Sequence, residues 1–438
     1  MHSSSGNRGL SGQRLYIAIA IWLFLILVGG LCTWYGWRGE SSQQAPTPTG
    51  ETTPTVEVTA VQPAPTTPTS PVEPTTGPPP EEVFGYGVAA HAVVGNTDYT
   101  MGQVKSLGLG WVKQQMRWAH VEPEQGKMEW DVYDWVVDAA NKQGLKVMFS
   151  VVDAPNWTRS TPLGEGVRGS PPDDLTEFAR FLGDLVDRYK GRVHAIEVWN
   201  EQNLDREWGN ATGVSPEEYV EMLRLAYQAI ESRDPSIIVI SGALSPVGFT
   251  GTDPNNPARV TVMDDFEYFD GMLTAGLLDN CDCVGAHHNG INMPPNVAWD
   301  EGYNDPTASF RGPFDNPDHS WSFKSTLWGY HDRIVAAGGD KPLCITEFGW
   351  ASAEGLGGYP PSFEFALDNT LEEQAQWDVE AFQEMREWGF VRLAFLWNLD
   401  FANKCNRDPT DPNAPYSLLD FDGAARPSFD AIGAMEKP

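Results

Sequence analysis

The sequence predicts an α/β fold in which residues 83–438 form a (β/α)8 TIM barrel, preceded by a single transmembrane helix and a disordered Pro/Thr-rich linker. Three observations predict the barrel. Eight short apolar or β-branched segments alternate with longer amphipathic ones, as strands and helices do around a parallel sheet. Residues 83–438 contain no second linker, and their length suits one barrel. No strand is followed by a Gly-rich phosphate loop, which disfavours an open doubly wound sheet.

The N-terminal segment predicts a membrane anchor. Residues 1–14 form a short tail, and residues 15–35 begin with the nearly unbroken apolar run LYIAIAIWLFLILVGGL. At about 1.5 Å per residue this run is long enough to span a bilayer. Trp34, Tyr35 and Trp37 stand where a cleaved signal peptide would have small residues. We therefore expect a single-pass signal anchor in the cell membrane with the barrel on the extracellular side, or a secreted protein if this segment is cleaved.

The linker, residues 36–82, is dominated by Pro, Thr, Ser, Gln and Glu. Such a composition cannot bury enough apolar surface to offset its ordering entropy, so an extended, solvated stalk is expected. At roughly 3 Å per residue it would hold the barrel about 100 Å from the bilayer.

The charge and the cysteines restrict the partners. The chain has 29 Lys and Arg against 60 Asp and Glu, a formal net charge of -31. This argues against nucleic acid as a partner, and no protein partner is implied. No zinc spacing is present, and we expect no metal and no cofactor. Because so large a domain has a sufficient core without disulfides, we expect Cys281, Cys283, Cys344 and Cys405 to be buried free thiols.

The eight predicted strands follow one another with amphipathic patterns between most of them. Several of these patterns end at a Gly, a common helix stop, as in DVYDWVVDAANKQG before the third strand. The strand segments are VFGYGVAA (83–90), WVKQQMRW (111–118), KVMFSVV (146–152), HAIEVWN (194–200), IIVISGA (237–243), CVGAHH (283–288), LCITEF (343–348) and RLAFLWN (392–398).

Function in a parallel barrel collects at the C-terminal ends of the strands. Two glutamates stand there, Glu201 after the fourth strand and Glu347 in the seventh. Hydrolysis of a glycosidic bond needs one carboxyl group to protonate the leaving oxygen and a second to attack or stabilise the anomeric carbon. Tryptophan rings stack on sugars, and amide and imidazole groups bond their hydroxyls. The other candidate substrate-binding residues at these ends are Lys113, Arg117, Trp157, Asn200, Asn203, His287, Asn289, Trp350 and Trp397.

Two motifs carry a family resemblance. EVWNEQN (197–203) and ITEFGW (345–350) resemble the WNEP and TEFG signatures of glycoside hydrolase clan A, the retaining enzymes with catalytic glutamates on strands four and seven. Residues 108–147 also resemble a segment of cellulase-like members and of relatives in family 39. The resemblance covers essentially all of 83–438. It implies a glycosidase that hydrolyses O-glycosyl bonds of a poly- or oligosaccharide by double displacement, and we expect these bonds to be β.

The resemblance also implies roles for individual positions. It makes Glu201 the general acid/base and Glu347 the nucleophile. Asn200 would bond the sugar 2-hydroxyl, Trp397 would form the floor of the subsite of the attacked sugar, and His287 matches a strand-six histidine that keeps the site polar. We expect carboxyl groups about 5 Å apart, net retention of configuration and a raised pKa for the acid.

Three positions depart from the family pattern. Gln202 replaces the usual Pro after the acid/base, which predicts a looser turn. Lys113 stands where relatives place an Arg that pairs with the nucleophile, so either Lys113 or Arg117, four residues along the same strand, takes that role. Asn289 stands where many relatives have a Tyr near the nucleophile.

Other interpretations stay open. Barrel-top packing explains Trp157 and Trp350 as well as sugar contact does, and Asn203 is open in the same way. The polar, Pro-rich stretch 290–321 is expected to be a surface loop that shapes the cleft. Two other functions fit the same residues: a non-catalytic carbohydrate-binding barrel, and a transglycosidase that remodels envelope glycans.

Overall fold

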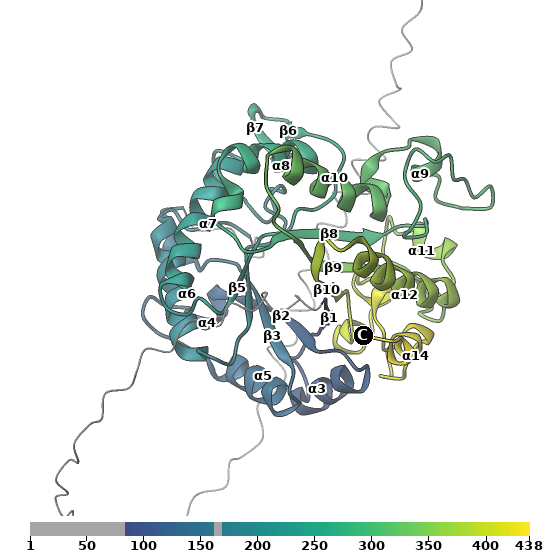
Figure 1. The fold of residues 1–438 in the computed structure, drawn as a ribbon, viewed down its shortest axis with the longest axis horizontal. Coiled ribbons are helices and arrows are strands. Elements are labelled where there is room, and N and C mark those ends of the chain that lie inside the picture. Colours follow the sequence, from purple (N-terminus) through teal and green to yellow (C-terminus); the bar gives the residue numbers. More distant parts are fainter. Residues whose placement is uncertain (1–83, 162–168) are drawn as a thin grey trace, which may run out of the picture.

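The computed structural model describes residues 84–161 and 169–438. Within them, eight parallel strands pair in the order β5-β4-β3-β2-β1-β10-β9-β8, and a parallel bridge between Ile240 and Cys283 joins the two outer strands. The predicted (β/α)8 barrel is therefore confirmed (Figure 1). The predicted transmembrane helix and linker lie outside the described residues. Among the helices that are described, none has the length and hydropathy needed to cross a bilayer.

Each of the eight predicted strand segments falls on one strand of the barrel. The prediction missed a short antiparallel hairpin, β6 and β7, because its residues are mostly exposed or half-buried and form no apolar run. The strands are β1 (Gly85–Ala89), β2 (Trp111–Arg117), β3 (Lys146–Val152), β4 (Ala195–Val198), β5 (Ile238–Ser241), β6 (Gly251–Asp253), β7 (Asn256–Val262), β8 (Val284–Gly290), β9 (Leu343–Trp350) and β10 (Val391–Leu396).

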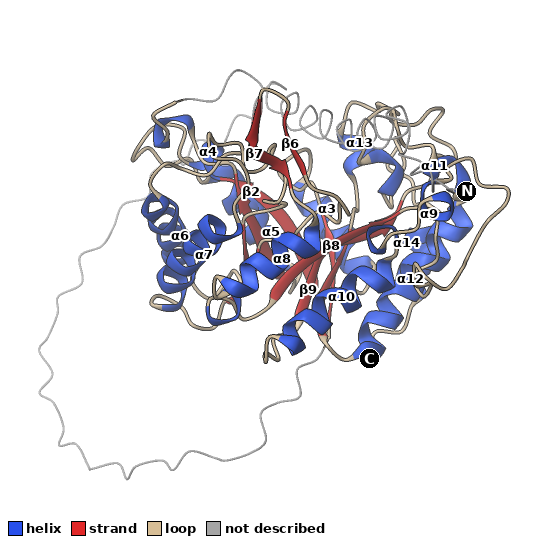
Figure 2. Cartoon of the chain, turned by 90° about the horizontal axis from the view of Figure 1, so that it is seen from above, coloured by secondary structure: helices blue, strands red, loops and turns tan. Residues whose placement is uncertain are grey.

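Helices surround the barrel, and loop elements gather at the end where the strands finish. Figure 2 shows β6 and β7 together with α4 and α13 at that end. The helices are α3 (Thr97–Ser106), α4 (Trp118–Val121), α5 (Asp131–Lys142), α6 (Leu175–Tyr189), α7 (Pro216–Glu231), α8 (Asp265–Thr274), α9 (Gly312–Asp315), α10 (Phe323–Ala336), α11 (Phe365–Asp368), α12 (Leu371–Trp388), α13 (Phe401–Lys404) and α14 (Pro427–Ala434). Single 3-10 turns are η2 (Asn156–Thr158), η3 (Leu277–Asp279), η4 (His319–Trp321) and η5 (Ala414–Tyr416).

The helix boundaries follow from local signals in the sequence. Asp174 caps α6 by accepting a hydrogen bond from the backbone of Thr176. Thr370 and Glu373 form a reciprocal capping box at the start of α12, and that helix ends at Gly389 in the left-handed conformation. These caps fix where the helices start and stop against the sheet.

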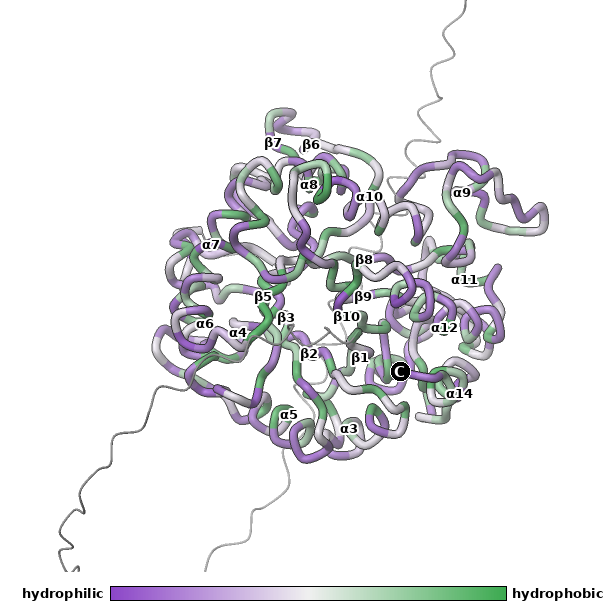
Figure 3. Tube along the Cα trace, in the orientation of Figure 1, coloured by the Kyte–Doolittle hydropathy of each residue, from purple (hydrophilic) through white to green (hydrophobic). Residues whose placement is uncertain are grey.

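Apolar side chains fill the end of the barrel where the strands begin. They form one buried cluster of Trp111, Met148, Ala195, Ile240, Cys283, Cys344, Leu393 and Phe395. Figure 3 shows hydrophobic residues concentrated on the central strands and hydrophilic ones on the surrounding helices and loops. The opposite end of the same barrel interior holds charged side chains, so an apolar floor lies beneath a polar site.

The expectation of free thiols is wrong for three of the four cysteines, Cys405 among them. Cys283 and Cys344 form a disulfide inside the barrel, while Cys281 is buried and free. The reason is strand order. The strands β8 and β9 are neighbours, and their register pairs Gly285 with Cys344, which brings Cys283 close to its partner. Spacing along the sequence does not reveal this contact because 61 residues separate the two cysteines.

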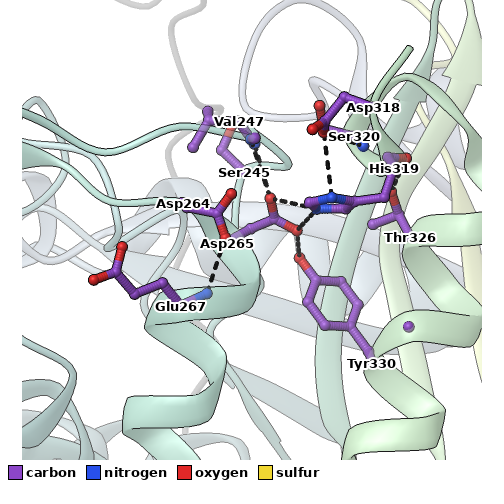
Figure 4. Close-up of polar contacts among 12 residues, drawn as sticks. Ser245, Val247, Asp264, Asp265, Glu267, Asp318, His319, Ser320, Thr326 and Tyr330 are labelled. Atoms are coloured by element: carbon purple, nitrogen blue, oxygen red, sulfur yellow. Dashed lines mark hydrogen bonds and ion pairs between the residues drawn. The ribbon is translucent and has the colours of Figure 1, made fainter.

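A polar cluster around Asp265 fastens the loops between β5 and β8 (Figure 4). The carboxylate of Asp265 is fully buried at the start of α8. It accepts hydrogen bonds from the backbone of Val247 (3.1 Å) and Gly248 (3.3 Å), from Nε2 of His319 (3.1 Å) and from the hydroxyl of Tyr330 (2.8 Å). Asp264 also offers an oxygen within 4.8 Å of ligand atoms on Asp265 and His319. Because four donors already satisfy Asp265, we assign the cluster a structural role.

Removal of the charge on Asp265 is expected to destabilise the barrel. Asp265→Asn should lower the free energy of unfolding by about 2–4 kcal/mol, because one partner is lost from a buried network of charged hydrogen bonds. Chemical denaturation of the whole chain measures this. The matched control is Asp270→Asn on the same helix, where an exposed ion pair with Arg333 contributes little. Equal stability of both variants would contradict the structural role of Asp265.

The stabilisation that the contact between Asp265 and His319 provides depends on pH. Burial disfavours the imidazolium of His319, but the hydrogen bond and charge of Asp265, with Asp318 and Asp264, raise its pKa above the ordinary value. The unfolded histidine titrates near pH 6.5. The stabilisation is therefore fully present below that pH and is lost as the pH rises through the higher pKa of the folded chain. The difference between wild type and Asp265→Asn should narrow in alkaline denaturation curves.

Candidate active site

The two glutamates predicted to be catalytic meet at one histidine. Glu201 follows β4, Glu347 lies on β9, and His287 lies on β8 between them in space. Oε1 of Glu201 is 3.3 Å from Nδ1 of His287, and Oε1 of Glu347 is 3.9 Å from Nε2. Burial alone would lower the pKa of His287, but the charge of Glu347 and the hydrogen bond with Glu201 raise it. The imidazole therefore lies between the two carboxylates, with Glu201 within hydrogen-bond distance and Glu347 slightly farther away.

Lys113 is the cation beside the predicted nucleophile. Its Nζ is 3.0 Å from Oε1 of Glu347 and 5.9 Å from the ring centre of Trp397. Arg117, the other candidate for this place, instead pairs with Asp153 at 3.4 Å. Burial would lower the pKa of Lys113, but Glu197 and Glu347 raise it, so the lysine is charged at neutral pH. Of the two alternatives that the sequence left open, the structure places Lys113 next to Glu347.

Glu197 is a third carboxylate in the site, and the sequence analysis missed it. It is fully buried on β4, where its oxygens lie 2.6 Å from Oγ1 of Thr346 and 3.3 Å from Nζ of Lys113. Burial would raise its pKa, but Lys113 and His287 lower it, so Glu197 is ionised. Its role is to position Lys113 and His287. The signal in the sequence was a glutamate inside an apolar strand, since a buried carboxylate needs a partner.

Arg206 is the second missed residue, and it corrects one expectation. Its Nη2 contacts Oε2 of Glu201 directly. Burial would raise the pKa of Glu201, but Arg206 and His287 lower it to about 2. The raised pKa expected for the acid is therefore wrong for this arrangement, in which Glu201 is ionised. Nothing in the sequence indicated that the turn after β4 returns a guanidinium to this carboxylate.

The backbone after β4 aims Glu201 into the site. Trp199 has φ 76° and Glu201 has φ 46°, both in the left-handed region that side chains rarely adopt and that recurs at functional sites. The backbone N–H of Glu201 donates to the carbonyl of Ala243 at 2.8 Å. The looser turn expected from Gln202 is wrong, because its buried amide donates to the carbonyl of Gly242 at 2.8 Å and ties the turn to β5.

Three further candidates lie where a ligand could use them. Trp397 follows β10 and is half-buried beside Lys113. The amide oxygens of Asn200 and Asn289 are buried and, within the described part of the chain, have no hydrogen-bond partner. Tyr416 on η5 is close enough that Glu347, in addition to burial, raises the pKa of its phenol.

The other three candidates are engaged in packing. Trp350 is 1 % exposed, and its Nε1 donates to the carbonyl of Met293 at 2.8 Å. Trp157 packs edge-on against Trp118, and its Nε1 donates to a backbone carbonyl at 2.9 Å. The amide nitrogen of Asn203 donates to the carbonyls of Ser245 and Met263, and its oxygen accepts from the backbone N–H of Ser245. The structure thus accounts for these side chains without a sugar.

Comparisons with known proteins find glycoside hydrolases among similar chains. The model of glycosyl hydrolase family 10 matches residues 81–239, a segment that includes Glu201. A β-1,4-xylanase of Dictyoglomus thermophilum is 30% identical over 93 residues, which are 21% of this chain and 25% of that protein. The chain thus spans about a quarter of this relative.

Solved structures share the fold. A family 39 glycoside hydrolase from the gut symbiont Bacteroides cellulosilyticus WH2 superposes with a TM-score of 0.54 at 18% identity, over 81% of this chain and 64% of that chain. A family 39 β-xylosidase from Caulobacter crescentus gives 0.52 at 16% identity, over 81% and 71%. A family 10 endoxylanase from a sugarcane soil metagenome gives 0.51 at 16% identity, over 81% and 96%. Together with the family-model match, these findings support a likeness of the chain to the clan A glycoside hydrolases.

Proposed function

We propose that the chain is a retaining glycoside hydrolase that cleaves O-glycosidic bonds, of β configuration, in a poly- or oligosaccharide by double displacement. The observation that carries the proposal is the placement of Glu201 and Glu347 on opposite nitrogens of His287, at the ends of strands four and seven of the barrel. The xylan-degrading relatives make a β-linked pentose or hexose polymer the first substrate class to test.

The nucleophile is Glu347 and the acid/base is Glu201. In the first step Glu347 attacks the anomeric carbon, the glycosidic C–O bond breaks, and the leaving oxygen takes the proton of Glu201. In the second step Glu201 removes a proton from water, which attacks the same carbon and releases Glu347. Lys113, at 3.0 Å, favours the ionised form of Glu347 that the attack needs.

The polar groups around this pair fit a sugar ring. Trp397 offers a half-buried ring face beside Lys113, and the unpaired amide oxygen of Asn200 can accept from the sugar 2-hydroxyl. No cofactor enters this mechanism, because the two carboxylates supply both the acid and the nucleophile.

A polysaccharide array with product sizing tests the proposal. Hydrolysis of at least one β-linked polymer to shorter products is the expected result, beside an aryl β-xyloside as a simple substrate. Products longer than the substrate would identify a transglycosidase instead. Binding without turnover would identify a carbohydrate-binding barrel and contradict the proposal.

We also propose that residues 15–35 anchor the enzyme in the cell membrane, with the barrel on the extracellular side. The apolar run in this segment supports this location. Carbonate extraction and protease treatment of intact cells test it. The expected result is a membrane-bound chain whose barrel is released by external protease, and a chain found only inside the cell would contradict it.

A further inference from the structure

The ion pair between Arg206 and Glu201 presents a chemical problem. Glu201 has to give a proton to the leaving oxygen, yet a guanidinium in contact with a carboxylate stabilises the ionised form, which has no proton to give. The pair must therefore open before the first step. The side chain of Arg206 is 28% exposed, against 11% for Glu201 and 1% for Lys113, so Arg206 is the cation of this group that a ligand reaches most easily.

Arg206 has N–H donors that are not used in hydrogen bonds to described residues. A guanidinium carries five N–H groups. Its Nε is buried and, among the described residues, makes no hydrogen bond. Oε1 of Glu207 lies 3.7 Å away, beyond hydrogen-bond distance. Burial raises the pKa of Glu207 to about 7, so this neighbour competes only weakly for Arg206 at neutral pH.

The chemistry of the guanidinium indicates what opens the pair. A sugar hydroxyl is a neutral acceptor and replaces a carboxylate poorly, whereas a second carboxylate offers Arg206 an equivalent charged partner with bidentate geometry. The acid/base lies beside the leaving group in a glycosidase, so a carboxylate on the leaving-group sugar would arrive next to Arg206. A uronic acid unit, in the backbone or as a branch on the leaving-group sugar, carries such a carboxylate.

The backbone holds Arg206 firmly enough to act as a binding residue. A Cβ placed on Gly169 would lie 1.9 Å from the carbonyl oxygen of Arg206. The two backbone segments are therefore closely packed, and the backbone of Arg206 has no room to shift toward Gly169. The backbone of Gly209 donates to the carbonyl of Gly169 at 3.0 Å on the same turn. The side chain can therefore exchange partners while its backbone stays in place.

From these contacts we infer that Arg206 binds the carboxylate of a uronic acid on the leaving-group side of the cleaved bond, and that this exchange of partners frees Glu201 to act as the acid. The inference rests on the proposed glycosidase function and adds the substrate class. The substrate is sparsely rather than uniformly charged, because a chain with a net charge of -31 repels a polyanion.

The test compares two polymers that differ only in this carboxylate: glucuronoxylan, and the same xylan with its uronic carboxyls reduced to alcohols. Wild type is expected to show a kcat/KM about 10-fold or more higher on the acidic polymer. Arg206→Gln should bring the ratio of the two values close to one, and Arg206→Lys, which keeps the charge but not the fork, should retain part of the preference. If Arg206→Gln only disturbed the structure, kcat/KM would fall on both polymers and the ratio of the two values would stay as in wild type.

Arg224→Gln is the matched control, since Arg224 lies on α7 and pairs only with the neighbouring Glu221 among described groups. It should keep the wild-type ratio. Three results would overturn the inference and leave the proposed function intact. They are equal kcat/KM of wild type on both polymers, a preference for the acidic polymer that survives in Arg206→Gln, and hydrolysis of an aryl xyloside but of neither polymer. A wild-type chain inactive on the aryl xyloside and on every polymer of the array would instead overturn the proposed function.

Discussion

Replacement of Glu347 by Gln is expected to lower kcat for glycoside hydrolysis by about 10⁴-fold or more, because a neutral amide cannot form the glycosyl ester that divides the reaction into two steps. The substitution keeps the size of the side chain. Lys113 keeps its second carboxylate, Glu197, at 3.3 Å, so the buried lysine is not left without a partner and the barrel should still fold. Initial rates on an aryl β-xyloside, measured beside thermal unfolding, check both parts of this expectation.

The matched control is Glu372→Gln in the first turn of α12, where the side chain is exposed. It should retain wild-type rates. A Glu347→Gln variant that is folded and keeps full activity would show that another group is the nucleophile.

Glu201→Gln is the second large effect, and it depends on the leaving group. For substrates with poor leaving groups, kcat/KM is expected to fall about 10²-fold to 10⁴-fold, because no proton reaches the departing oxygen. A dinitrophenyl glycoside needs no such proton, so its first step should proceed. The glycosyl enzyme then accumulates, because no base activates water, and a burst of dinitrophenol followed by slow turnover is expected.

Added azide provides the decisive comparison for Glu201. Azide attacks the intermediate without general-base help, so it should restore turnover of the Glu201→Gln variant and give a β-glycosyl azide. Wild type should form none, since the ionised Glu201 repels an anion. An equal loss of activity for good and poor leaving groups, with no rescue by azide, would show that Glu201 is not the acid/base.

The fold was largely predictable from the sequence, because the strands of a closed barrel are buried and read as apolar runs. KVMFSVV and LCITEF are examples, and each falls on a strand, β3 or β9. The hairpin of β6 and β7 escaped prediction because most of its residues are exposed or half-buried, so no continuous apolar run marks it. The Cys283–Cys344 disulfide also escaped, since the expectation that a large core needs no cross-link is a general tendency and says nothing about neighbouring strands.

The site was predictable only in part. Residues at strand ends, such as Glu347 and His287, could be placed from the order of the predicted strands, since parallel strands finish at one face of the barrel. The choice between Lys113 and Arg117 needed coordinates, because both lie on the same face of β2 and only their position along the strand separates them. Arg206 lies in a turn, where neither helix nor strand period tells which way a side chain points.

The most direct test of the central assignment is to trap the covalent intermediate. A 2-deoxy-2-fluoro β-xyloside with a dinitrophenyl leaving group forms the glycosyl enzyme and slows its hydrolysis, and mass spectrometry of the peptides locates the sugar. The assignment predicts one fluoroxylosyl group per chain, attached to Glu347. A sugar attached to a different residue, or a product released with inverted configuration and no adduct at all, would contradict it.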